Sequence, residues 1–262
     1  MHPALWISKT GLDAQQTDIA VISNNLANAS TVGFKKSRAI FEDLLYQNIN
    51  QPGGRSSQDT EMPNGLMVGA GTKVVATQKN FSQGNMTTTD NSLDFMIQGN
   101  GFFEIQRPDG TLAYTRNGQF SIDENGRLVT SGAGFPLQPE VNIPEDAQSV
   151  TISQQGEISV QIPGQGAGVA IGQLTITDFI NPAGLEPIGQ NLFTETGVSG
   201  APNQGNPGLD GLGIVVQGAL ETSNVNVTEE LVNMIESQRV YEMNSKVIST
   251  VDQMLSFITQ QL

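Results

Sequence analysis

The chain has 262 residues, a net charge of −14 at pH 7 and no cysteine. Its length allows one large domain or two modest ones, each with a real core. With only 12 Lys and Arg residues, it is unsuited to binding nucleic acid or an anionic membrane surface, since both need clustered cations. The absence of cysteine excludes disulfides, a thiolate nucleophile and a cysteine zinc site.

The first predicted element is an amphipathic helix over residues 3–28, which forms the N-terminal helical domain expected over residues 1–34. Pro3 suits the first helical position, where its missing N–H costs nothing. Asparagines within Ser23–Lys35, which reads SNNLANASTVGFK, are expected to end the helix because they tolerate left-handed backbone and satisfy terminal carbonyls. Apolar residues recur every seven positions, which keeps one face toward a helical partner. This row, the first half of a predicted assembly seam, is Leu5, Leu12, Ile19 and Leu26.

An extended linker is expected over residues 35–75, followed by a β domain over 76–215. Gln47–Gly65 is polar and rich in Gly, Pro and Ser, so it is expected to be irregular, as is Ser199–Gly213. Between them, apolar residues alternate as in half-buried strands. Asp-Gly and Asn-Gly pairs at 109–110, 117–118 and 125–126 punctuate this region at the spacing of successive short antiparallel strands.

After a return linker over residues 216–225, a second amphipathic helix is predicted over 226–262. Asn226 is expected to cap it, with Glu229 completing a capping box. An ordinary helix packed on its own domain would show a similar stripe. Because both ends of the chain share one period, we instead expect the helices to pair with each other and with neighbouring subunits. The second half of the predicted seam is Val227, Met234, Tyr241, Ile248, Leu255 and Leu262.

Catalytic and metal-binding patterns are weak throughout. The single histidine, His2, lies at the chain end, so a Ser/His/Asp arrangement is excluded. Asp123–Gly126 fits a hairpin turn better than a calcium loop. Asp94 and Glu104 are interpreted as solvated carboxylates at strand edges rather than as a glycosidase pair. We therefore predict a protein that is not an enzyme and has no cofactor or metal.

Three separated motifs resemble those of flagellar rod and hook axial proteins. The middle one comprises Gly99–Phe103 with Ala113–Arg116. Val32 departs from the family, in which proline is common before the Gly-Phe-Lys. The resemblance extends over essentially the whole chain. The terminal motifs include Ser23–Lys35 and Leu220–Asn226, and within them the family residues are Asn25, Leu26, Ala27, Asn28, Gly33 and Phe34, and then Asn224, Val225 and Asn226.

This resemblance implies an α+β fold in which the terminal helices pair as an inner coiled coil and a mainly antiparallel β domain lies outside them. The segment after Tyr46 is similar to an insert of the members that build the distal rod. The implied function is a polymerising subunit of a hollow drive shaft that transmits torque from motor to hook. The insert is expected to cross-link neighbouring subunits and stiffen the shaft.

The implied partners are other copies of the chain, proximal rod proteins, the hook protein and the P- and L-ring proteins. The implied location is the basal body across periplasm and outer membrane, reached by type III export. The start of the chain lacks the basic leader and apolar run of a cleaved signal peptide. No stretch reaches the roughly 18 apolar residues of a membrane span. The alternatives are a proximal rod or hook protein and, in another class, a secreted monomeric β-domain binding module.

Overall fold

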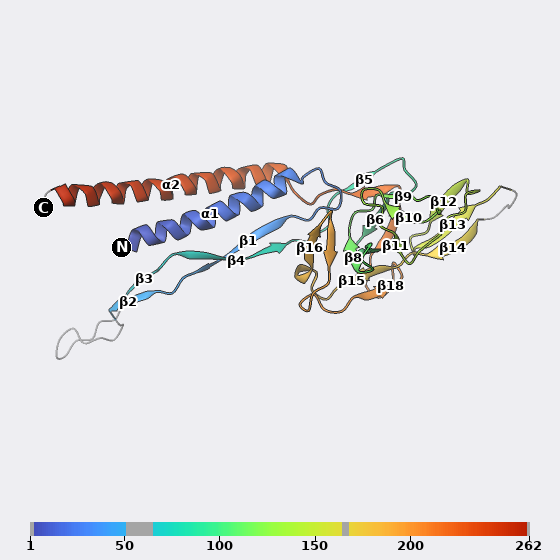
Figure 1. Ribbon diagram of the computed structural model, residues 1–262, viewed down its shortest axis with the longest axis horizontal. Coiled ribbons are helices and arrows are strands. Elements are labelled where there is room, and N and C mark those ends of the chain that lie inside the picture. The colour runs from blue at the N-terminus through green and yellow to red at the C-terminus, as the bar shows by residue number, and fades with distance from the viewer. Residues whose placement is uncertain (1–2, 51–64, 164–167, 261–262) are drawn as a thin grey trace. The chain divides into compact units, whose positions relative to one another are not determined.

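A computed structural model describes residues 3–50, 65–163 and 168–260 (Figure 1). The predicted α+β class is confirmed, since one helix at each end flanks a central antiparallel β region. The chain forms two compact units. The helical unit comprises Met1–Ala27, Ser37–Gln78 and Asn226–Leu262, and the β unit comprises Asn28–Lys36 and Lys79–Val225.

Two long helices, α1 (Pro3–Ala27) and α2 (Val227–Gln260), lie side by side in the helical unit (Figure 1). They run antiparallel, because Asn25 contacts Glu230 whereas Asp18 contacts Ser237 further along α2. The Asn226 side chain caps α2 by accepting a hydrogen bond from the backbone N–H of Thr228 at 3.1 Å.

A narrow β ribbon completes the helical unit. β1 (Ser37–Asp43) pairs with β4 (Thr72–Lys79), and β2 (Gln47–Asn50) pairs antiparallel with β3 (Leu66–Val68). Much of the described part of the expected linker is therefore paired strand. Residues 51–64 of the predicted insert lie outside the described residues.

The β unit is built from short strands in several small sheets. Its largest sheet has the order β11-β7-β8-β17-β16, and a second has the order β12-β13-β14. A 3-10 turn at Pro182–Gly184 precedes β16. The strands are β5 (Met86–Thr88), β6 (Phe95–Gln98), β7 (Phe103–Gln106), β8 (Leu112–Thr115), β9 (Phe120–Ile122), β10 (Leu128–Thr130), β11 (Leu137–Gln138), β12 (Ser149–Ile152), β13 (Glu157–Gln161), β14 (Val169–Gln173), β15 (Ile176–Asp178), β16 (Glu186–Gly189), β17 (Leu192–Thr194), β18 (Asn203–Gly205), β19 (Ile214–Gln217) and β20 (Ala219–Glu221).

Two of the three punctuating turns join paired strands as predicted. Asp109-Gly110 connects β7 to β8, and Asn125-Gly126 connects β9 to β10 in the hairpin preferred over a calcium loop. Asn117-Gly118 differs, because β8 and β9 pair with other strands. Gly118 accepts a hydrogen bond from the N–H of Phe95 at 2.9 Å. A Cβ at Gly118 would lie 1.5 Å from the carbonyl oxygen of Phe95, so this close crossing requires glycine.

The core of the β unit is apolar and aromatic, and it also buries two carboxylates that were expected to be solvated. Asp94 and Glu104 are only 7% and 8% exposed. The Asp94 carboxylate accepts hydrogen bonds from the Thr89 hydroxyl at 2.7 Å and from the Asn91 amide at 3.0 Å. That of Glu104 accepts one from the Thr177 hydroxyl at 3.1 Å. These local hydroxyl and amide donors explain why the interpretation as solvated edges was wrong.

The burial of Tyr114 makes the stability of this core depend on pH. Tyr114 is 1% exposed, its ring lies 4.8 Å from that of Phe179, and burial, reinforced by Glu104 and Glu195, raises its pKa to about 12. Above pH ~10 the unfolded chain loses the phenolic proton while the folded chain keeps it. The stability present below pH 10 therefore falls as the pH rises toward 12, by roughly 2–3 kcal/mol in total.

We expect Tyr114→Phe to reduce this alkaline loss of stability. Urea unfolding of the variant and the parent at pH 9 and pH 11 measures it. Tyr46→Phe is the matched control, because Tyr46 is 58% exposed and lies in the helical unit. Equal alkaline losses in parent and Tyr114→Phe would contradict the prediction.

Candidate assembly interface

The α2 row that faces α1 is small and mostly polar. Glu230, Ser237 and Val251 are the buried residues of α2, and they fall on one heptad row with Asn244. Ser237 donates its hydroxyl to Asp18 at 2.8 Å, and the Glu230 carboxylate accepts the Asn25 amide at 3.2 Å. A Cβ added at Gly11 would meet the Asn244 amide at 3.0 Å, so the helices approach closely there. The contact within one chain therefore includes hydrogen bonds and a close approach of small groups along this row.

The seam residues predicted on α2 lie beside this row, three positions before it in each heptad. Val227, Tyr241 and Leu255 are 44%, 41% and 39% exposed. Met234 and Ile248 are partly buried, as are Leu5, Leu12, Ile19 and Leu26 on α1. Leu262 lies outside the described residues. Pairing of α1 with α2 thus leaves much of the predicted seam uncovered.

Further apolar side chains add to this uncovered surface. On α1, Trp6 and Ile7 are 47% and 37% exposed. Such side chains are candidates for an interaction site, because large exposed apolar patches typically mark one. The other exposed large apolar residues of α2 are Leu231, Val232, Ile235, Met243, Val247, Met254, Phe257 and Ile258.

The N-terminal motif supplies a side chain that joins α1 to the β ribbon. The buried Asn25 amide donates to the carbonyl of Ser37 at 2.8 Å, and its oxygen accepts the N–H of Ser37 at 2.9 Å. The side chain thus replaces a backbone partner at the start of β1. Its neighbours Leu26 and Asn28 are partly buried and Ala27 is exposed.

All three motifs contribute to a buried ion-pair cluster in the β unit, which we define as Lys35, Arg116 and Glu221. The ammonium of Lys35 lies 2.6 Å from one carboxylate oxygen of Glu221, and the Arg116 guanidinium lies 3.5 Å from the other. Their side chains are 0%, 4% and 1% exposed, respectively. Burial lowers the pKa of both Lys35 and Arg116, while the Glu221 carboxylate opposes that effect.

Backbone groups complete the ion-pair cluster. Lys35 donates to the carbonyl of Ser82 at 2.8 Å, Arg116 donates to that of Gly99 at 2.7 Å, and the N–H of Gly84 donates to Glu221 at 2.8 Å. One carboxylate and several carbonyls therefore accept hydrogen bonds from two buried cations, while the Nε of Arg116 is buried without a hydrogen-bond partner among the described residues. The cluster joins segments from the beginning, middle and end of the chain.

The remaining motif residues hold the chain around this cluster. The N–H of Gly33 donates to the carbonyl of Glu221 at 2.8 Å, and a Cβ at Gly33 would lie 2.8 Å from the backbone of Arg116. Phe34 is buried beneath the ammonium of Lys79, which lies 4.9 Å from its ring. Burial also lowers the pKa of Lys79.

Asn224 ties the returning chain to the segment before β1. Its oxygen accepts the N–H of Lys36 at 2.7 Å, and its amide donates to the carbonyl of Asn80 at 2.9 Å. Val225, which follows, is partly buried, and Asn226 caps α2. These long-range bonds explain why Asn28–Lys36 belongs to the β unit, although residues 1–34 had been grouped with the first helix.

Sequence reasoning did not identify the partnership of Lys35, Arg116 and Glu221, although the motifs that carry the resemblance contain all three. The sequence signal that could have identified these three residues is the apolar stretch next to each charge. Lys35 follows Phe34, Glu221 follows Ala219 and Leu220, and Arg116 ends a buried strand segment. A charge in such an apolar context indicates burial with a partner.

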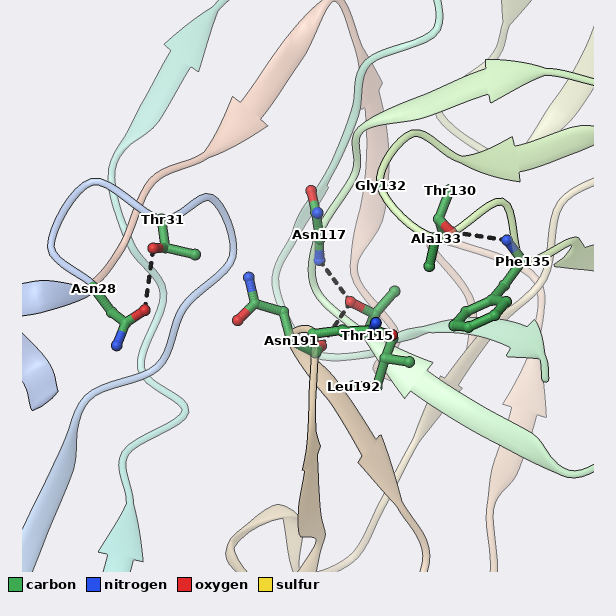
Figure 2. Close-up of a pocket in the computed structure, with 11 residues that line it drawn as sticks. Asn28, Thr31, Thr115, Asn117, Thr130, Gly132, Ala133, Phe135, Asn191 and Leu192 are labelled. Atoms are coloured by element: carbon green, nitrogen blue, oxygen red, sulfur yellow. Dashed lines mark hydrogen bonds between the residues drawn. The ribbon is translucent and has the colours of Figure 1, made fainter. Parts of the chain in front are cut away.

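A pocket of about 440 Å³ opens in the β unit between the turn after α1 and the ends of β8 and β17 (Figure 2). Its polar groups largely bond one another, since the Thr115 hydroxyl donates to the carbonyl of Asn191 at 2.9 Å and Asn191 donates to that of Val32 at 2.9 Å. No carboxylate, histidine or cation lines it. Its lining is Asn28, Thr31, Thr115, Asn117, Thr130, Gly132, Ala133, Phe135, Gln190, Asn191 and Leu192.

Within residues 3–50, 65–163 and 168–260, no group of three or more His, Cys, Asp or Glu side chains is placed to hold a metal ion. Neither helix of that described part is long and apolar enough to span a membrane.

Comparison with known proteins assigns the family. The model described as "Flagella basal body rod protein" matches residues 6–35. "Flagellar hook protein FlgE/F/G D1 domain" matches residues 96–160, and "Flagellar basal body rod FlgEFG protein C-terminal" matches residues 216–261.

Whole-length relatives agree with this assignment. A "Flagellar basal-body rod protein FlgG" of Buchnera aphidicola is 55% identical over 99% of this chain and 100% of its own length. Proteins with the same description from Borreliella burgdorferi and Bacillus subtilis are 49% and 39% identical, each over 97% of both chains. The chain therefore belongs to the family of flagellar basal-body rod proteins.

Proposed function

We propose that the chain is a structural subunit, and not an enzyme, that polymerises into the hollow distal rod of the flagellum and transmits torque from motor to hook. Relatives named as basal-body rod proteins support this along the whole length of the chain. The same comparison disfavours the alternative of a secreted monomeric binding module.

The observation that carries the proposal is the arrangement of the terminal helices. Polar and small side chains face the helix partner within the chain, whereas large apolar side chains remain exposed on α2. Burying one such side chain stabilises a contact by about 1.5–3 kcal/mol. Association with other subunits that cover these side chains is therefore favourable. Contacts between unlike surfaces that do not close into a ring generate a helical filament.

The further partners and the location belong to the same proposal. A distal rod meets proximal rod proteins at one end and the hook protein at the other, and the P- and L-ring proteins surround it. It spans the periplasm and outer membrane of the basal body and is assembled after type III export without removal of a signal peptide. A chain without cysteine suits such a route, because it cannot form a wrong disulfide in an oxidising compartment.

The test is assembly of the purified chain. We expect light scattering to rise steeply above a threshold protein concentration and electron microscopy to show straight tubes of uniform diameter. A fragment of residues 28–225 is the control, because it contains the whole β unit and lacks both helices. A full-length chain that stays monomeric at every concentration and salt condition, and that fails to extend a proximal rod in cells, would contradict the proposal.

A further inference from the structure

The α2 helix extends past the beginning of α1. Asn25, Asp18 and Gly11 lie level with Glu230, Ser237 and Asn244, so each step of seven along α1 matches a step of seven along α2. Continuing this register places Pro3, the first described residue of α1, beside Asp252. Residues 253–260 of α2 therefore project beyond the described part of α1, by about 12 Å at 1.5 Å per residue.

This projecting segment, which we call the overhang, carries several large apolar side chains, whereas the row of α2 that faces α1 is mostly polar. Met254, Leu255, Phe257 and Ile258 are 53%, 39%, 60% and 55% exposed. Ile258 continues the heptad row of Glu230, Ser237, Asn244 and Val251 that faces α1. In the overhang, the side of α2 that elsewhere packs against α1 therefore has no neighbouring residue in the described part of α1.

A second apolar surface lies at the other end of the same helix. Val227, Leu231 and Ile235 are spaced by four residues, which places them on one stripe. They are 44%, 43% and 51% exposed, so the contact with α1 leaves this stripe available. We call it the α2 entry stripe.

We propose that the overhang of one copy packs against the α2 entry stripe of a second copy of this chain. This rests on the proposed function, because it specifies which surfaces meet in the polymer. The occupant is a second copy because every copy carries both surfaces, and family members are named as basal-body rod proteins. The two surfaces differ, so each contact leaves one overhang and one stripe free, and growth continues.

The competing arrangement is contact between two overhangs. That contact is the same on both sides, so it closes into a dimer in which both overhangs are used and no overhang is left to bind the two free entry stripes. The two arrangements predict different neighbours for Met254, and cross-linking distinguishes them. A disulfide needs Cα atoms about 4.4–6.8 Å apart, so it reports direct contact.

The experiment uses single-cysteine variants of the full-length chain, which has no cysteine of its own. Met254→Cys and Leu231→Cys proteins are purified separately, mixed under assembly conditions and oxidised. We expect a covalent dimer in the mixture at least tenfold more abundant than in either variant alone. Ile180→Cys replaces Leu231→Cys in the control, because Ile180 is 92% exposed but lies in the β unit.

Circular dichroism checks that each variant is folded, and microscopy checks that the mixture assembles. Tubes without the mixed cross-link would overturn this inference while leaving the proposed function intact. A strong cross-link in Met254→Cys alone would also overturn it, in favour of the closed dimer. If wild-type protein forms no tubes, the failure lies with the proposed function instead.

Discussion

Replacing Glu221 with glutamine is expected to lower the free energy of unfolding of the β unit by about 3–5 kcal/mol, the cost typical of removing one partner from a buried ion pair. Glutamine keeps the shape of the side chain but removes its charge. The ammonium of Lys35, 2.6 Å away, and the guanidinium of Arg116 would then be buried with backbone carbonyls alone. The N–H of Gly84 would lose its charged acceptor.

Urea unfolding followed by circular dichroism measures this change in the whole chain and in residues 28–225, which contain the entire β unit with Lys35 and lack both helices. Glu157→Gln is the matched control, because it removes the same charge from an exposed position on β13. A double variant, Lys35→Met with Glu221→Leu, is expected to be closer to the parent than Glu221→Gln, because it removes a cation together with its anion. A Glu221→Gln variant within about 0.5 kcal/mol of the parent, the usual range of surface substitutions, would show that the ion-pair cluster does not stabilise the fold.

The helices were predictable because their signals are local. Pro3 marks the start of α1, Asn226 caps α2, and α2 contains neither glycine nor proline. The heptad period defined the apolar row of the predicted seam, whose role in assembly stays a prediction. It did not identify the face toward α1, because Glu230, Ser237 and Asn244 carry no apolar signal. Which of two adjacent rows a helix buries depends on the partner that is present.

Long-range contacts limited the remaining predictions. The β1–β4 ribbon joins segments about 30 residues apart across the insert, and its polar composition resembles that of a linker. The burial of Asp94 depends on Thr89 and Asn91 folding back toward it. Nothing in the residues next to Lys35 specifies Glu221 as its partner, nearly two hundred positions away. The resemblance identified the motifs, and only the fold brings their charges together.

Leu255→Asp is expected to separate assembly from folding. Leu255 is 39% exposed in the single chain and lies in the overhang, so the isolated subunit loses little when it is replaced. We expect its unfolding free energy to change by less than about 1 kcal/mol. In the polymer, by contrast, the change removes about 1.5–3 kcal/mol of apolar burial and places a carboxylate against an apolar surface.

Because this cost recurs at every contact, Leu255→Asp is expected to abolish polymerisation. The threshold concentration measured by light scattering should rise at least a hundredfold, and cells whose only copy of this protein carries the substitution should not swim. Ser256→Asp is the matched control, because it introduces the same charge one residue away on an exposed polar position. Leu255→Ala should have an intermediate effect, since it shortens the apolar contact without adding a charge. Normal tubes from Leu255→Asp would place Leu255 outside the interface. Loss of tubes in Ser256→Asp to the same degree would mean that charge at the end of α2, rather than the apolar contact of Leu255, controls assembly.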